Sequence, residues 1–161
     1  MANAAQLRVQ DTVAAAEAEC YATINGQRIN MMHAINCEAT YEKSKKEVPI
    51  LGRVSKANKA VGGKGSGKMT VHYVTSRMRA LMINYIKTGQ DIYFDMQITN
   101  EDPTSSVGRQ TVILKDCNLD STTIAKFDAD GDYLSEDVNF TFESVEMPKN
   151  LPIRREWFKE E

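Results

Sequence analysis

Apolar and polar residues alternate with a period of two in two stretches of the second half of the chain. The apolar members are Ile92, Phe94, Met96 and Ile98 in the first stretch, and Val138, Phe140 and Phe142 in the second. A period of two places successive side chains on opposite faces of a strand. Both stretches are therefore predicted to be half-buried strands.

Shorter segments extend this pattern into an antiparallel sheet. The pair Asn25-Gly26 separates two apolar runs, which favours a type I′ hairpin because both central residues of that turn need positive φ. Further strands are expected over residues 34–41, 69–74, 109–118 and 122–127, with an acidic turn over residues 128–132 before the last strand.

One segment has helical spacing. Its apolar residues are Met78, Leu81, Met82, Tyr85 and Ile86. This spacing predicts a helix over residues 76–88 whose apolar face packs on a sheet. Ser76 is expected to cap its start and Gly89 to end it in a left-handed conformation. The predicted fold is mainly β (α+β), an antiparallel β-sandwich or half-barrel of six or seven strands with one flanking helix.

The remaining segments define the expected organisation of the chain. Residues 52–67 contain four glycines near their end and lack apolar periodicity, so a long loop is expected there. Residues 1–18 are polar and alanine-rich and are expected to form an amino-terminal arm. Residues 1–147 would then be one domain, and residues 148–161 a polar tail.

Composition narrows the class of protein. The 161 residues are 42% hydrophobic and carry a formal net charge of −2, which is typical of one globular domain and gives no global basic field for nucleic acid or anionic lipid. No apolar run approaches the roughly 20 residues of a membrane helix. The amino end lacks the features of a secretory signal. We therefore expect folding in a cytoplasm and no contact with a membrane.

No cluster of residues predicts an active site. Cys20, Cys37 and Cys117 are far apart and without a C-x-x-C spacing, so reduced, largely buried thiols are expected. His33 and His72 have no partner at a catalytic or metal-ligand spacing. The sequence predicts no catalytic residue, no metal site and no cofactor.

Two segments resemble ligand-binding loops, one for phosphate and one for calcium, but each lacks residues that the motif requires. Residues 62–68 read GGKGSGK and satisfy G-x-x-x-x-G-K, but Met69 stands where a Ser or Thr must reach magnesium. A P-loop also opens a helix, whereas this segment precedes a predicted strand. Residues 128–131 resemble a calcium loop, yet Lys126 and Asp137 occupy the positions that need Asp and Glu.

Opposite charges gather in two regions of this nearly neutral chain. Residues 43–68 contain eight basic side chains and one acid, and residues 128–146 contain seven acids and no base. Complementary patches on one subunit suit head-to-tail association, which propagates into rings or filaments. The candidate contact residues are Arg53, Lys56, Lys59, Lys64 and Lys68 in the basic loop, and Asp128, Asp130, Asp132, Glu136 and Asp137 in the acidic patch.

The segment YFDMQITNEDPTSSVGRQTV at residues 93–112, with LKDCNLD and KFDADGDYLSEDVNFTFE after it, resembles the tail tube (core tail) protein family. These are tube proteins of contractile-tailed phages and of defective prophages of Gram-positive bacteria. The VPILG, HYVTS and Ile24-Asn25-Gly26 segments resemble the same family in the same order. The similarity covers residues 20–147.

The resemblance implies a structural subunit that forms hexameric rings, stacked as a hollow DNA conduit inside a contractile sheath. The implied partners are further copies of the chain and the tail sheath, tape measure, baseplate and tail terminator proteins, with DNA only in transit. The candidate lumen residues are Asp95, Gln97, Thr99, Asn139, Thr141 and Glu143, none of them basic. Lysine at position 97 or 141 is expected to hinder DNA passage.

Two other functions stay open at this point. An injection-tube protein of a related secretion or bacteriocin device would share the architecture without carrying DNA. A phosphate-binding or nucleic-acid-binding domain would use the glycine-lysine loop, although no aromatic residue lies between Leu51 and Tyr73 to stack on bases.

Overall fold

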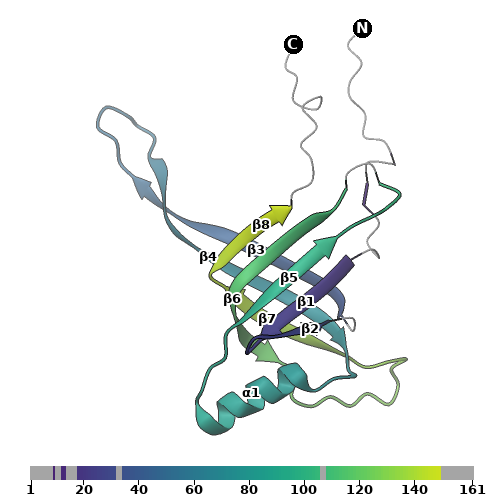
Figure 1. Ribbon diagram of the computed structural model, residues 1–161. Helices are drawn as coiled ribbons and strands as arrows, with labels where there is room; N and C mark the ends of the chain where they lie inside the picture. Colours follow the sequence, from purple (N-terminus) through teal and green to yellow (C-terminus); the bar gives the residue numbers. More distant parts are fainter. Residues whose placement is uncertain (1–8, 10–11, 14–17, 32–33, 106–107, 150–161) are drawn as a thin grey trace.

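The computed structural model describes residues 9, 12–13, 18–31, 34–105 and 108–149 (Figure 1). The strands are β1 (Ala18–Ile24), β2 (Gln27–Asn30), β3 (Ala34–Val48), β4 (Ala57–His72), β5 (Phe94–Asn100), β6 (Gln110–Thr122), β7 (Ser135–Phe142) and β8 (Ser144–Lys149). One helix, α1 (Arg77–Thr88), lies between β4 and β5. The mainly β class with one helix is confirmed. Nearly all of the expected arm and tail lie outside the described residues.

All strand pairs are antiparallel, in the order β2-β1-β5-β6-β7-β4-β3, with β8 added along β6. Strand β6 is shared by two layers. We call β2, β1, β5, β8 and the first half of β6 the β5 layer, and β7, β4, β3 and the second half of β6 the β4 layer. The layers face each other, since Cys37 Sγ of β3 lies 3.9 Å from Met96 Sδ of β5.

The sheet bends where β6 passes from one layer to the other. Asp116 has a φ of 53°, and the register with β5 shifts beside it. On the opposite strand, Glu143 separates β7 from β8 and donates its backbone N–H to the Lys115 carbonyl over 3.1 Å. A bulge at this point turns both strands together, so a continuous sheet folds into a sandwich.

The core lies between the two layers. Its buried members include Ala22, Met69, Met96, Leu114, Cys117, Val138 and Phe140. The alternation predicted for β7 is confirmed, because Val138, Phe140 and Phe142 are all buried. The Asn25-Gly26 hairpin is also confirmed: both residues have positive φ between β1 and β2. Strand β8 was not expected, and it continues two residues past the predicted boundary at 147.

The predicted loop over residues 52–67 is wrong. Residues 57–67 belong to β4, which pairs with β3 in a long hairpin whose turn covers residues 49–56. Figure 1 shows the outer part of this hairpin projecting beyond the rest of the sheet. The glycines are explained by packing: a Cβ on Gly65 or Gly67 would lie within 2.5 Å of the Phe142 or Phe140 ring. Aromatic rings from β7 therefore occupy the space above these glycines.

Helix α1 lies across one end of the sandwich rather than over a face of the sheet (Figure 1). It packs mainly against β6, and only Met78 among its residues is buried. Gly89 ends the helix with a φ of 70°, as predicted, but Ser76 makes no side-chain cap hydrogen bond. With φ −101° and ψ 10°, Ser76 lacks the extended conformation that directs an N-cap side chain to the helix.

The three cysteines are free thiols that are buried or half-buried, as expected. Burial raises the pKa of the Cys20 thiol to about 12 and that of Cys37 to about 11. Burial, with a smaller contribution from the Asp95 carboxylate, raises the pKa of Cys117 to about 12. The thiolate is the reactive form, so all three cysteine side chains are protonated and unreactive near neutral pH.

Candidate functional site

Within the described residues, no group of three or more His, Cys, Asp or Glu side chains is placed to hold a metal ion. No helix in that part of the chain is long and apolar enough to cross a membrane. The features that stand out are surfaces: the projecting hairpin, the loop before β7, the outer faces of the two layers and the outermost strands.

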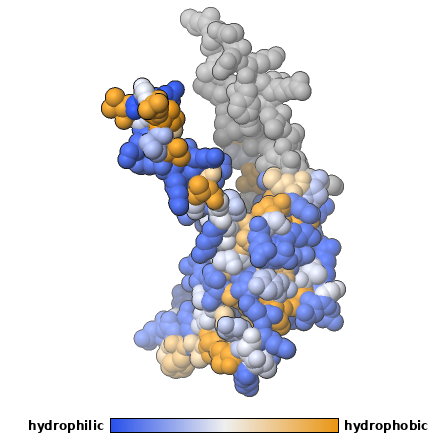
Figure 2. Space-filling view, turned by 90° about the vertical axis from the view of Figure 1, so that its left-hand side faces the viewer, coloured by the Kyte–Doolittle hydropathy of each residue, from blue (hydrophilic) through white to orange (hydrophobic). Residues whose placement is uncertain are grey.

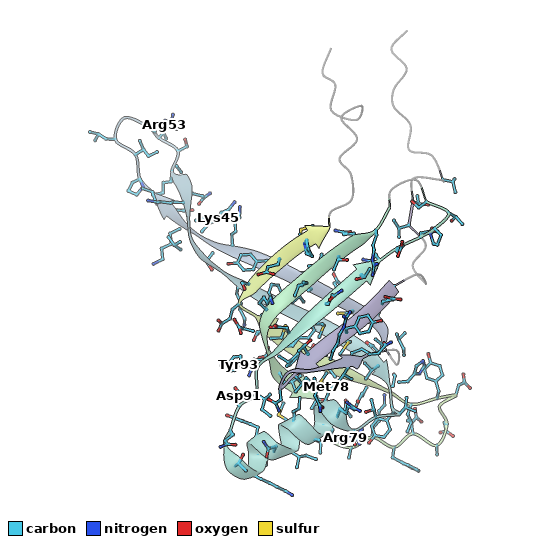
Figure 3. All side chains as sticks on the ribbon, viewed as in Figure 1. Lys45, Arg53, Met78, Arg79, Asp91 and Tyr93 are labelled. Atoms are coloured by element: carbon cyan, nitrogen blue, oxygen red, sulfur yellow. The ribbon has the colours of Figure 1, made fainter. Side chains whose placement is uncertain are left out.

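The basic residues predicted for a loop lie instead along the β3–β4 hairpin. Arg53 is at its turn and Lys45 lies on one arm, as Figure 3 shows. Lys56 forms an ion pair with Glu47 over 3.6 Å. Lys59 pairs in register with Lys46, and the two hairpin arms thus hold like charges opposite each other. The basic side chains of the hairpin therefore suit it to bind an acidic surface.

The hairpin turn also carries apolar side chains without cover. Leu51 and Val54 are fully exposed, and Ile50 is 40% exposed. Figure 2 shows this apolar surface at the end of the projecting hairpin. Exposed apolar groups gathered at one place mark interaction sites. We did not predict this feature, although the apolar residues at 48–54 stand out in an otherwise basic segment.

The acidic patch is smaller than predicted. Glu136 is 2% exposed, so it does not belong to an exposed patch; it lies in the β7 alternation that also places Val138 and Phe140 in the core. Asp137 forms an ion pair with Lys68 over 3.4 Å and accepts a hydrogen bond from Thr70. The Thr70 hydroxyl, followed by Lys68, lowers the pKa of the Asp137 carboxyl.

Three exposed carboxylates therefore remain in the loop between β6 and β7, namely Asp128, Asp130 and Asp132. The backbone N–H of Asp130 donates to Asp128 Oδ1 over 3.1 Å, which holds a tight turn. Phe127 beside them is 90% exposed. This loop and α1 lie at the same end of the molecule, away from the hairpin turn (Figure 1).

Buried Glu136 is paired with Arg79 of α1. The Arg79 Nη2 atom lies 3.2 Å from Glu136 Oε2, and Arg79 Nε donates to the Thr123 carbonyl over 3.3 Å. The guanidinium also lies over the Tyr73 ring, 4.2 Å from its centroid. Figure 3 labels Arg79 beneath the sandwich. These contacts fix α1 to β7 and to the start of the acidic loop.

The candidate lumen residues fall into two groups on different layers. Asp95, Gln97 and Thr99 lie on β5, whereas Asn139 and Thr141 lie on β7, and Glu143 sits at the bend between β7 and β8. Each group faces away from the shared core. Since the layers pack face to face, their outer surfaces point in different directions, and one channel wall cannot include both groups.

On the outer face of the β4 layer, the paired positions of β3, β4 and β7 all carry polar side chains. These are Asn36, Glu38, Thr40 and Glu42 of β3, Lys64, Ser66, Lys68 and Thr70 of β4, and Asp137, Asn139 and Thr141 of β7. On the β5 layer, Gln97 is flanked by Tyr21 and Ile113, and Thr99 is only 2% exposed. The outer face of the β4 layer is therefore better suited to face water than the outer face of the β5 layer.

Among the described residues three strands have a single partner strand: β2 and β3 at the two ends of the sheet order, and β8 beside β6. Strand β3 is 15 residues long. An outermost strand presents unpaired backbone N–H and C=O groups, which can pair with another chain. Together with the projecting hairpin, these edges give the subunit surfaces for both lateral and end-on association.

Known proteins with similar sequences or folds are subunits of phage tails and related assemblies. The chain is 39% identical to the phage-like element PBSX protein XkdM of Bacillus subtilis strain 168 over 145 residues, which are 90% of this chain and 96% of the relative. Its fold is similar to a chain of a PVC extracellular contractile injection system, solved as a sheath-tube complex in the extended state. That likeness has a TM-score of 0.64 at 13% identity, over 86% of this chain and 93% of that one.

The SPP1 tail tube also shares the fold, with a TM-score of 0.60 at 7% identity over 90% of this chain and 84% of that one. Residues 5–149 match the family described as phage tail tube protein. Members of this family are structural proteins of phage tails or tail-like particles and not enzymes. The sequence, the fold and the comparisons thus lead to one conclusion: this chain belongs to the phage tail tube protein family.

Proposed function

We propose that this chain forms hexameric rings that stack into the hollow tube of a contractile tail and conduct DNA. The observation that carries the proposal is the combination of open strand edges with a projecting hairpin in a tail tube family member. Edge pairing between neighbours would close a ring, and the hairpin would reach the next ring. The tube would assemble in the host cytoplasm with sheath, tape measure, baseplate and terminator proteins.

The first test is negative-stain electron microscopy of the purified protein across a range of concentration and salt. Rings or tubes with an open centre are the expected result. Dissociation at high salt would accompany them if charged surfaces hold the rings together, because the screening length falls from about 8 Å at physiological ionic strength to about 3 Å at 1 M. Protein that stays monomeric, with or without purified baseplate as an initiator, would overturn the proposal.

The lumen wall is assigned to the outer face of the β4 layer, because that face is polar along β3, β4 and β7. A channel for DNA requires a hydrated wall with few unpaired cations, since each phosphate contact from lysine strengthens binding. Two lysines lie on this face: Asp137 pairs with Lys68 over 3.4 Å, and Glu42 of β3 stands opposite Lys64 in register. The wall therefore retains little net attraction for DNA.

Thr141→Lys should assemble normally and lower DNA delivery by roughly tenfold or more, because every ring would gain lysines that contact phosphate. Gln97→Lys, on the β5 layer, is the matched control and should deliver DNA normally. The measurement is infectivity or transduction per particle, with tubes counted by microscopy. Equal loss in both variants, or normal delivery by Thr141→Lys, would contradict the assignment of the β4 layer.

Ring stacking is proposed to involve Lys59 and Lys64 of the hairpin and the exposed carboxylates Asp128, Asp130 and Asp132. Lys59→Glu with Lys64→Glu should shorten the tubes and lower the salt concentration at which they fall apart, while single rings remain. Tube length by microscopy and a salt titration measure this. Adding Asp128→Lys and Asp130→Lys to the double replacement restores the net charge, exchanges the charges of the two surfaces and should recover tube length. Tubes unaffected by the double replacement would remove Lys59 and Lys64 from the contact.

A further inference from the structure

The apolar face of α1 is only partly covered within the subunit. Met78 is buried, but Tyr85 and Ile86 in the last turns are 48% and 68% exposed. A pocket of about 210 Å³ opens between this half of the helix and β6. It is lined by Leu81, Met82, Tyr85, Asp91, Ile92, Asn118, Leu119 and Asp120.

The pocket combines an apolar lining with negative charge. Its lining contains two carboxylates, Asp91 and Asp120, and no basic side chain. One oxygen of Asp91 accepts the backbone N–H of Ile92 over 3.1 Å, so this carboxylate is held at the mouth of the pocket. A ligand that fits would bring an aliphatic group for the interior and a cation for the rim.

The turn of the β3–β4 hairpin has the matching chemistry. Leu51 and Val54 are fully exposed, and Arg53 lies between them. Residues 43–64 contain seven basic side chains and one acid, Glu47. An arginine between two exposed aliphatic side chains presents both required groups within one turn.

We propose that the pocket between α1 and β6 receives the hairpin turn of a second copy of this chain. Leu51 and Val54 would fill the apolar interior, and Arg53 would lie against Asp91 and Asp120. The inference rests on the proposed function and names the surface on which the hairpin docks.

Geometry favours a second copy over contact within one subunit. The hairpin turn, marked by Arg53, and the pocket, marked by Asp91, lie at opposite ends of the molecule (Figure 3). Each copy thus carries one turn and one pocket that it cannot bring together itself. A contact between unlike surfaces at opposite ends repeats from copy to copy, as stacking of rings requires.

Cysteine cross-linking tests the proposed pair of surfaces directly. The variant Val54→Cys with Tyr85→Cys, assembled and mildly oxidised, should give a ladder of covalent species above the dimer on a non-reducing gel. Each single variant is a control and can give at most a dimer. The native thiols are buried or half-buried with raised pKa values, so they add little background.

Assembly measurements test the chemistry of the contact. Leu51→Ser should raise the critical concentration for tubes roughly tenfold to a hundredfold, because a buried aliphatic side chain is lost from each contact. Leu51→Met keeps the apolar character and is the matched control. Arg53→Glu and Asp120→Lys should each weaken assembly, and the double variant should recover most of it.

The results separate this inference from the proposed function. Wild-type tubes with no ladder, and with Leu51→Ser assembling normally, would overturn the docking site and leave the tube function standing. Wild-type protein that forms neither rings nor tubes would overturn both. A ladder together with recovery in the charge-exchanged double variant supports the site, because a loss of folding cannot be rescued by exchanging two exposed charges.

Discussion

Phe140→Ala should lower the free energy of unfolding by about 3–5 kcal/mol, the usual cost of emptying a buried aromatic site. The Phe140 ring has no exposed surface and lies between the two layers. It also covers the face of β4 above Gly67, where a Cβ would stand 2.3 Å from the ring. Urea unfolding, at protein concentrations too low for assembly, measures the change.

Gly67→Ala tests the same contact from the other strand. The added methyl group must displace a fully buried ring, so a loss of about 1–3 kcal/mol is expected. In a Phe140→Leu background the ring is absent and the cost of Gly67→Ala should fall below 1 kcal/mol, a coupling of the size found for residues in contact. Ser66→Ala, on the outer face of the same strand, is the control and should change stability by no more than about 0.5 kcal/mol.

Equal costs for Gly67→Ala in the wild-type and Phe140→Leu backgrounds would contradict this account of the glycines. The loss would then come from a contact other than the Phe140 ring, because the effect of glycine on the unfolded chain makes Gly→Ala stabilising rather than costly. The two explanations differ only in the coupling, so the double variant decides between them.

The same contact explains what the sequence could not predict about the hairpin. Strands β5 and β7 were predictable because their own residues alternate between core and surface. The middle of β4 has no such alternation, since Gly63, Gly65 and Gly67 stand where apolar side chains would be expected. The rings that cover them belong to other strands: Tyr41 of β3, and Phe142 and Phe140 of β7. Local pattern therefore indicated a loop where the structure has a strand. Strand β8 escaped prediction for a related reason: its residues 144–148 are all exposed.

The candidate surfaces were predictable in part. Charge counts along the sequence located the basic hairpin and the acidic loop, because both segments are exposed. They could not separate Glu136 from its neighbours, although its spacing of two from Val138 was a usable signal for burial. The split of the lumen residues between two layers also required the structure, because it depends on the bend at Asp116. Nothing in the local pattern near Asp116 predicts that bend.

Arg79→Met should destabilise the subunit by about 3–5 kcal/mol, because it leaves a buried carboxylate without its cation. The Glu136 side chain is 1% exposed, and its Oε1 atom already makes no hydrogen bond within the described residues. The Arg79 side chain is 17% exposed and supplies the ion pair, the bond to Thr123 and the contact with Tyr73. The loss should also loosen α1 and weaken assembly through the pocket beside it.

Two variants decide whether the buried charge is the cause. Arg79→Met with Glu136→Met removes both charges and should recover most of the lost stability, since an apolar pair of similar volume often replaces a buried ion pair without cost. Lys68→Met breaks the exposed pair with Asp137, in which both side chains are more than half exposed, and should cost less than about 1 kcal/mol. If Arg79→Met costs no more than Lys68→Met, Glu136 must reach solvent when its partner is lost, and α1 would then be held by its apolar contacts alone.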